Sequence, residues 1–70
     1  MPYFNYHSNI KKKIKENKDF QAFIVDNYNG ISPCLLIKID TKYYPIREHR
    51  WQEYFDIANR NNVIIQDKRT

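Results

Sequence analysis

Residues 20–39 read FQAFIVDNYNGISPCLLIKI and decide the fold. Two apolar runs rich in aromatic and β-branched residues flank a polar segment, which is typical of two strands joined by a turn. The dipeptide Asn29-Gly30 is favoured in two-residue hairpin turns, because both residues adopt a positive φ at little cost. The stretch therefore predicts a β-hairpin with strands over residues 20–27 and 34–39.

A third strand follows directly along the chain. Asp40 and Thr41 predict a tight turn into residues 42–46. Pro45 indicates a sheet edge or the end of this strand, because proline cannot donate a ladder hydrogen bond. The alternation in the preceding strand separates two faces, with Leu35, Ile37 and Ile39 on one and Cys34, Leu36 and Lys38 on the other.

A second helix is predicted over residues 47–60. Its apolar residues recur at the i, i+3, i+4, i+7 spacing of a buried helical stripe, formed by Trp51, Tyr54, Phe55 and Ala58. Residues 63–66 predict a short last strand, and residues 67–70 are expected to fray.

The beginning of the chain allows two interpretations. A longer helix from Pro2 would align Tyr3 and Tyr6 with two isoleucines further along. We prefer a helix over residues 9–17 capped by the Ser8 hydroxyl, with residues 1–7 frayed. The full order is then α-β-β-β-α-β, a single α+β domain over residues 1–70 with an antiparallel sheet and both helices on one face.

Composition limits the classes of protein to which the chain can belong. The 41% hydrophobic and 16% aromatic content of these 70 residues is too high for a disordered chain. No apolar run is long enough for a membrane span, and no signal-peptide pattern is present, so we expect no membrane partner. The single Cys34 forms no internal disulfide, which favours the cytoplasm. A core this thin makes a homodimer attractive, because an interface adds burial.

Positive charge gathers near the start of the chain. The formal net charge is +4, and the first 18 residues hold five lysines against one glutamate. A localised cationic patch favours an acidic partner, and cations that neutralise phosphates bind nucleic acid in a salt-dependent way. The predicted contact residues are Lys11, Lys12, Lys13, Lys15 and Lys18, with Arg47 and Arg50 as a possible extension.

Aromatic residues near that charge would strengthen the hypothesis, because bases stack on aromatic rings. Tyrosine serves protein interfaces equally well. The candidates for stacking or interface contacts are Tyr3, Tyr6, Tyr43 and Tyr44, with Phe4 beside them.

No catalytic, cofactor or metal site is predicted. His49, Glu53 and Asp56 lie on the polar side of the second helix, where we expect local pairs of His49 with Glu53 and of Asp56 with Arg60. Cys34 is expected to be a buried structural thiol, and Trp51 a core anchor.

Two functions of different classes fit these patterns. The first is a small non-enzymatic module that engages nucleic acid or a nucleoprotein complex through its lysine-rich N-terminal segment. The second is a phage or mobile-element effector that inhibits a host factor, such as a nuclease or defence complex, through an acidic protein surface. More than half of the chain consists of residue types with A/T-rich codons, which is common in phages and many bacteria. The position of the exposed aromatic residues relative to the lysines distinguishes the two functions.

Overall fold

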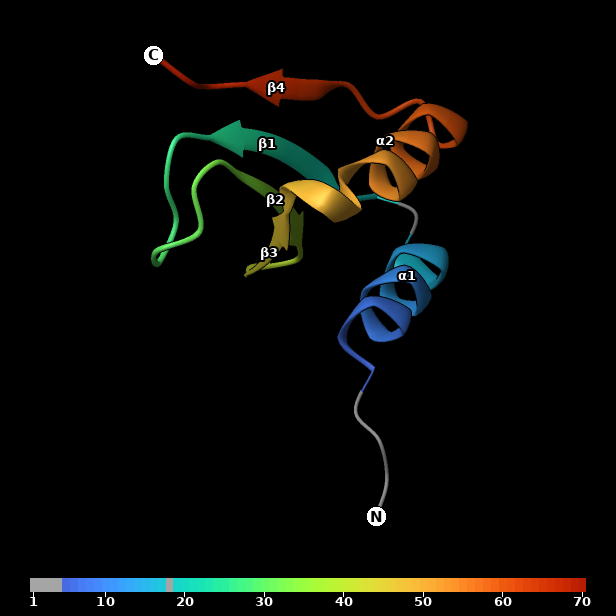
Figure 1. Cartoon of the computed structure of the whole chain (residues 1–70). Coiled ribbons are helices and arrows are strands. Elements are labelled where there is room, and N and C mark those ends of the chain that lie inside the picture. Colours follow the sequence, from blue (N-terminus) through green and yellow to red (C-terminus); the bar gives the residue numbers. More distant parts are fainter. Residues whose placement is uncertain (1–4, 18) are drawn as a thin grey trace.

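The computed structural model of the chain describes residues 5–17 and 19–70. Its elements follow the predicted order α-β-β-β-α-β (Figure 1). They are α1 (Tyr6–Asn17), β1 (Gln21–Val25), β2 (Cys34–Ile39), β3 (Lys42–Arg47), the 3-10 turn η1 (Glu48–Arg50), α2 (Trp51–Arg60) and β4 (Ile65–Asp67). The second helix was predicted from residue 47, but α2 begins at Trp51 because β3 and η1 occupy residues 47–50.

The four strands form one sheet in the order β3-β2-β1-β4. The β1–β2 and β2–β3 pairs are antiparallel, as predicted, whereas β4 pairs in parallel with β1. The prediction of a wholly antiparallel sheet is therefore wrong. The reason is the connection through α2: a helix between two strands carries the chain back to its starting end, so that the next strand runs in the same direction.

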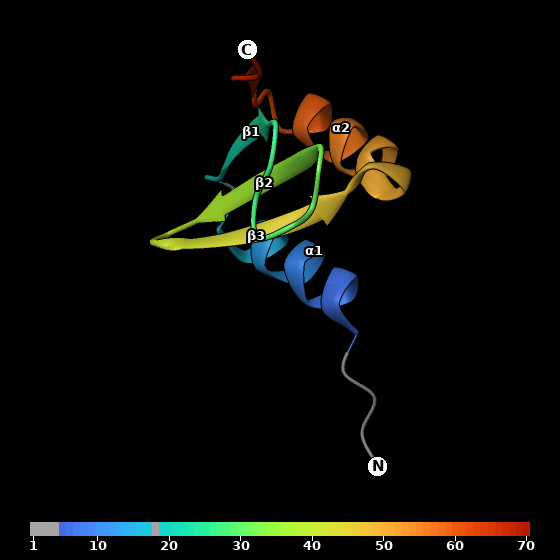
Figure 2. The same cartoon turned by 60° about the vertical axis from the view of Figure 1, so that its left-hand side comes forward.

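Both helices cover one face of the sheet (Figures 1 and 2). Between them and the strands lies the core, in which α1 contributes Ile10 and Ile14 and α2 contributes Trp51, Tyr54 and Ala58. The sheet faces these residues with Ala22, Ile24, Leu35, Ile37, Ile39 and Ile46. Neither α1 nor α2 packs on the opposite side, which we call the bare face. The β1–β2 loop lies over part of it (Figure 2), and Cys34 and Leu36 on this face are buried.

The connection between β1 and β2 contains the predicted hairpin turn. Asn29 and Gly30 adopt φ of 50° and 86°, and the backbones of Tyr28 and Ile31 exchange hydrogen bonds of 3.0 and 2.9 Å on either side of them. The turn is confirmed, but it is the tip of a longer loop, because the two strands end at Val25 and begin at Cys34. The turn into β3 has Asp40 at φ 57°.

The first helix begins three residues before the predicted start. Asn5 Oδ1 accepts a 2.9 Å hydrogen bond from the backbone N–H of Ser8, which makes Asn5 the cap and places Ser8 inside the first turn. The earlier start adds Tyr6 to the face that carries Ile10 and Ile14, so one more aromatic side chain packs against the core. The expected fraying of residues 5–7 is wrong, and residues 1–4 lie outside the described residues.

The C-terminal residues are held against the sheet. The backbone N–H of Lys68 donates to Ile24 at 2.8 Å, and the Thr70 hydroxyl lies 3.1 Å from Asp26 Oδ2. Residues 67–70, which we expected to fray, therefore continue the pairing of β4 with β1 in this structure, and the prediction of fraying stays a prediction. Neither helix in residues 5–17 and 19–70 has the length and apolar character needed to cross a membrane.

Candidate nucleic-acid interface

The lysines of α1 point in several directions. Lys11 and Lys15 line a groove beside α2, whereas Lys13 lines a hollow at the β2–β3 turn. Lys12 is exposed, and Lys18 lies outside the described residues. The helix spreads its charge in this way because Ile10 and Ile14 occupy its inward face, and neighbouring residues of a helix are about 100° apart. The segment that looked like one patch in sequence is therefore divided among several surfaces.

Glu53 binds two of the predicted cations. Its carboxylate pairs with Lys11 of α1 and accepts hydrogen bonds from Arg50 Nε at 2.6 Å and from the second guanidinium nitrogen at 3.1 Å. The hydrogen bonds from Arg50 and Lys11 lower the pKa of Glu53 to about 2. Both cations therefore stabilise the fold locally, which makes them less available to a polyanion than an unpaired lysine.

The pairs expected on α2 do not form among the described residues. Glu53 binds Arg50 and Lys11 in place of His49, and the Arg60 guanidinium donates to the backbone carbonyl of Asp56 at 3.4 Å. No group of three His, Cys, Asp or Glu side chains in residues 5–17 and 19–70 could hold a metal ion.

His7 joins the two helices. Its Nδ1 lies 2.7 Å from the Tyr54 hydroxyl, and the ring packs against the ring of Tyr54. Burial lowers the pKa of His7, and Arg50 lowers it further. Burial also raises the pKa of the Tyr54 hydroxyl. Both groups are therefore neutral near pH 7, and the contact is a structural hydrogen bond.

Of the four tyrosine candidates, Tyr43 is the one with an exposed side chain among residues 5–17 and 19–70. The Tyr6 hydroxyl donates to the carbonyl of Pro45 at 3.1 Å, and burial raises the pKa of Tyr6 to about 12. Tyr44 is half-buried against the core, and Tyr3 lies outside the described residues, as does Phe4. Tyr43 remains, with 46% of its surface exposed.

Tyr43 lies on the bare face of the sheet. Its neighbours there are Phe23 and Leu36 on the next two strands, and Tyr28 from the β1–β2 loop. Together with Val25 and Lys68 these side chains line a hollow of about 330 Å³. Phe23 is half-buried, so an aromatic ring is accessible on each of two strands.

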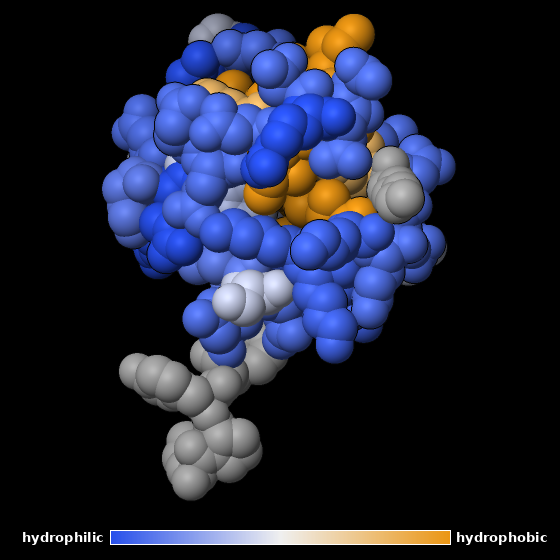
Figure 3. Space-filling view, turned by 90° about the vertical axis from the view of Figure 1, so that its right-hand side faces the viewer, coloured by the Kyte–Doolittle hydropathy of each residue, from blue (hydrophilic) through white to orange (hydrophobic). Residues whose placement is uncertain are grey.

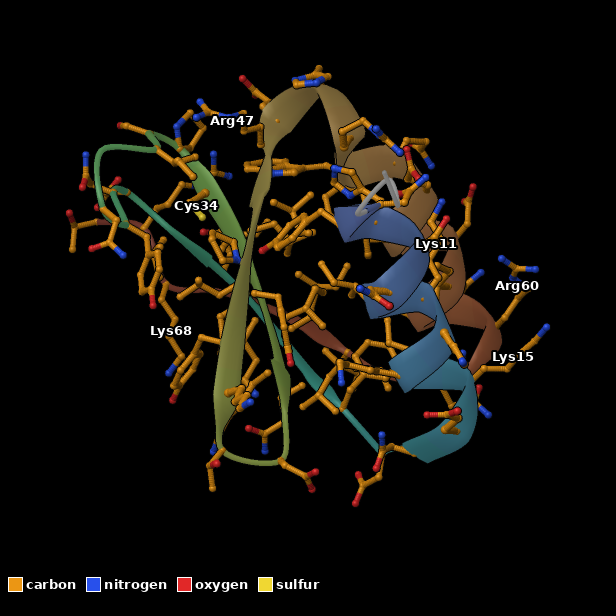
Figure 4. The ribbon with its side chains drawn as sticks, turned by 90° about the horizontal axis from the view of Figure 1, so that it is seen from below. Lys11, Lys15, Cys34, Arg47, Arg60 and Lys68 are labelled. Carbon is orange, nitrogen blue, oxygen red and sulfur yellow. The ribbon has the colours of Figure 1, made fainter. Side chains whose placement is uncertain are left out.

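Each of these two rings is accompanied by an ammonium group. Lys68 Nζ lies 5.3 Å from the ring centroid of Phe23, and Lys38 Nζ lies 5.8 Å from that of Tyr43. Arg47 is a third cation on this face, because it lies opposite Cys34 in the β2–β3 register. Figure 4 shows both Arg47 and Lys68 on the side of the sheet away from the helices. The outward positions of the strands carry no carboxylate and are Gln21, Phe23, Val25, Cys34, Leu36, Lys38, Tyr43, Pro45, Arg47 and Gln66.

The bare face was only partly visible in the sequence. Tyr43 and Arg47 were among the predicted contact residues, whereas Phe23, Lys38 and Lys68 were not. The alternation along β2 assigned Lys38 to the face opposite Leu35, and the structure confirms this. Extending the same alternation to β1 would have added Phe23, but Lys68 carried no signal, because it lies in a tail that was expected to fray.

Cys34 lies at the edge of this surface and is buried, as predicted. Burial raises the pKa of its thiol, so the reactive thiolate form is disfavoured. No family model, curated protein or solved structure matches the chain.

Proposed function

We propose that this chain is a small non-enzymatic module that binds single-stranded nucleic acid across the bare face of its sheet. The observation that carries the proposal is the pairing of Phe23 and Tyr43 with Lys68 and Lys38 at strand positions that carry no carboxylate. Asp19 and Asp40 lie beside Lys38 at one end of this face, so the path for phosphates is on the side of Lys68 and Arg47. Aromatic rings stack on bases of any sequence, and nearby cations attract the phosphates. A four-stranded sheet with accessible aromatic rings is an established platform for single strands.

The α1 helix supports a direct nucleic-acid contact less well. Lys11 is paired with Glu53, and only Lys15 and Arg60 face the same groove without a carboxylate partner among the described residues. No aromatic ring lines that groove. The lysines of α1 contribute chiefly through the net charge of +4, which increases the rate at which a polyanion approaches.

A duplex fits the bare face less well than a single strand. Stacking on Phe23 and Tyr43 requires bases that are not paired in a helix, and the hollow between the rings is floored by the apolar side chain of Leu36. We place the protein in the cytoplasm, where its free Cys34 thiol would persist.

The test compares labelled 12-nucleotide single strands of deoxythymidine and uridine with a 12-base-pair duplex, by fluorescence anisotropy at low salt. We expect weak binding of both single strands and weaker binding of the duplex. Tyr43→Ala should cost about 1–3 kcal/mol of binding free energy, whereas Tyr43→Phe keeps the ring and should bind like the parent.

The salt dependence gives a second measurement. Three cations on this face, Lys38, Arg47 and Lys68, correspond to a slope of about −2 in log affinity against log salt on a single strand. Changing Lys38 and Lys68 to Gln should remove most of that slope, and the matched change of Lys12 and Lys13 to Gln should leave it nearly intact.

Two results would overturn the proposal. One is the absence of salt-sensitive binding to any of the three oligonucleotides at low ionic strength. The other is a homodimer, measured by light scattering, that dissociates in Phe23→Ser, because the bare face would then be the interface between two copies.

A further inference from the structure

A groove runs between α1 and α2 on the side of the molecule away from the bare face. Its volume is about 410 Å³, and its lining residues are Lys11, Ile14, Lys15, Ile57, Arg60 and Asn61. Figure 3 shows a hydrophobic floor on this side, surrounded by hydrophilic side chains. We propose that this groove binds an acidic, amphipathic segment of a partner protein.

The floor of the groove is aliphatic. Ile14 is buried beneath it, and Ile57 is half-buried at its side. Each isoleucine belongs to a different helix, so an apolar side chain inserted here would contact both helices. Removing such a side chain from water favours the complex.

The rim of the groove is cationic. Lys15 and Arg60 lie side by side at the same end of the two helices (Figure 4), and neither forms an ion pair with a carboxylate within residues 5–17 and 19–70. A basic residue in the last turn of a helix offsets the helix dipole, which accounts for the presence of both cations. The dipole does not account for their position on either side of an apolar floor. This combination complements a segment in which carboxylates flank an apolar residue.

The groove is short. Its lining residues lie within 11–15 and 57–61, about one turn of each helix, or about 6 Å at a rise of about 1.5 Å per residue. At the far end the Lys11 ammonium is neutralised by Glu53, so the free positive charge lies at the end formed by Lys15 and Arg60. An occupant would place one apolar side chain on the floor and its carboxylates at that end, as in helix-in-groove recognition.

Nucleic acid fits this groove poorly. Its lining has aliphatic and cationic side chains but no aromatic ring, so bases have no stacking partner. A second copy of this chain fits poorly as well, because α1 and its surroundings are basic and like charges opposed across an interface cost free energy. The groove and the bare face lie on opposite sides of the sheet, so one chain has room for both partners at once.

The test uses the whole chain as bait for a random 12-residue peptide library, followed by synthesis of the enriched peptides and anisotropy measurements. We expect enrichment of Asp and Glu around Leu, Ile or Phe. The double variant Lys15→Glu, Arg60→Glu should bind these peptides at least ten-fold more weakly. The matched control Lys12→Glu, Lys13→Glu makes the same change of net charge outside the groove and should bind within about two-fold of the parent, since salt screens exposed charges that are not in contact.

A second variant addresses the floor. Ile57→Ser should weaken the same peptides at least ten-fold, and a melting curve checks that the fold is intact. If Ile57→Ser unfolds, the charge-reversed double variant carries the test alone. The proposal is overturned if acidic, apolar peptides are not enriched, or if they bind the double variant as well as the parent.

Measuring the binding of oligonucleotides to the same variants distinguishes this proposal from the function proposed above. Single-stranded oligonucleotides should not displace the peptides from the groove. If the oligonucleotides lose affinity on Lys15→Glu, Arg60→Glu and keep it on Tyr43→Ala, the groove is a nucleic-acid site and both proposals fail. If only Tyr43→Ala loses affinity for the oligonucleotides, and this variant still binds the peptides, the result supports two separate sites.

Discussion

The two faces of the sheet come from alternate residues of the same strands, and they differ in almost every property. On the covered face Ile37 and Ile46 have no exposed surface, and the helices exclude water. On the bare face Tyr43 is 46% exposed, and Phe23 is half-buried beneath a lysine. The covered face is aliphatic and closed, whereas the bare face has aromatic and cationic side chains that are partly accessible around the buried Cys34 and Leu36.

The difference follows from the placement of the helices. In residues 5–17 and 19–70, α1 and α2, of 12 and 10 residues, both pack on one side of the four-stranded sheet, and no helix packs on the other. A bare face that served only solubility would be polar. Accessible apolar surface among cations is instead the basis of the binding role that we propose for this face. The covered face therefore determines stability, and the bare face is available for function.

The largest expected effect is on the covered face, at Trp51. Its indole N–H donates to the carbonyl of Ile46 at 2.9 Å, and its ring packs against Phe55, so it joins α2 to β3. Trp51→Ala should lower the free energy of unfolding by about 3–5 kcal/mol, as truncation of a large aromatic residue in a core does. Chemical denaturation measures this. A variant that melts within a few degrees of the parent would show that the covered face does not control stability.

A smaller effect on stability is expected at the N-terminal cap of α1, because the substitution removes a single capping hydrogen bond. Asn5 accepts the N–H of Ser8, so Asn5→Ala should cost about 1–2 kcal/mol. Ser8→Ala is the matched control and should change little, since the Ser8 hydroxyl forms no hydrogen bond with residues 5–17 or 19–70. Equal losses of stability in the two variants would indicate that the Ser8 hydroxyl also caps the helix, as the sequence predicted.

Some parts of the fold can be predicted from local sequence alone. The hairpin turn at Asn29-Gly30, the strand over residues 34–39 and the stripe on α2 depend on nearby residues, and all three are confirmed. The helix start was wrong because Asn5 and Ser8 are both good caps. The choice between them depends on Tyr6 packing against the core, which local sequence does not contain.

The strand partner of β4 and the grouping of the site residues could not be predicted from the sequence, because both depend on contacts between residues far apart in the chain. The parallel partner of β4 depends on how α2 returns the chain across the sheet. Lys68 reaches Phe23 only because the tail continues that pairing, and Lys11 meets Glu53 from 42 positions away in the chain. Lysines adjacent in sequence were thus separated in space, while distant ones gathered beside aromatic rings.

Glu53 links the two helices of the covered face, and its effect depends on pH. Its pKa is lowered from the ordinary value of 4.5 to about 2 by hydrogen bonds from Arg50 and Lys11. A carboxyl whose pKa is lower in the folded state stabilises the fold above its unfolded pKa and loses this contribution as pH falls. Glu53→Gln should therefore cost about 1 kcal/mol at pH 7, in the range for partly exposed ion pairs.

The measurement is the free energy of unfolding as a function of pH for the parent and Glu53→Gln. The gap between the two should be constant above about pH 5 and should close as pH approaches 2. A gap that persists at pH 2 would mean that Glu53 acts through packing and not through its charge. Asp56→Gln, on the same helix with no cation within ion-pair distance in the described residues, should show no such pH-dependent gap.

The smallest effect on stability is expected on the bare face, at the residue with the largest proposed effect on binding. Tyr43 lies on an edge strand and is 46% exposed, and the Lys38 ammonium lies 5.8 Å from its ring centroid. Tyr43→Ala should therefore change the free energy of unfolding by less than about 0.5 kcal/mol, as exposed substitutions do. Tyr44→Ala, one position along and half-buried against the core, should cost several times more. If Tyr43→Ala instead destabilises the protein as much as Tyr44→Ala, the ring is needed for folding, and its exposure no longer argues for a binding role. A small loss of stability together with a large loss of oligonucleotide affinity would separate the two faces by function.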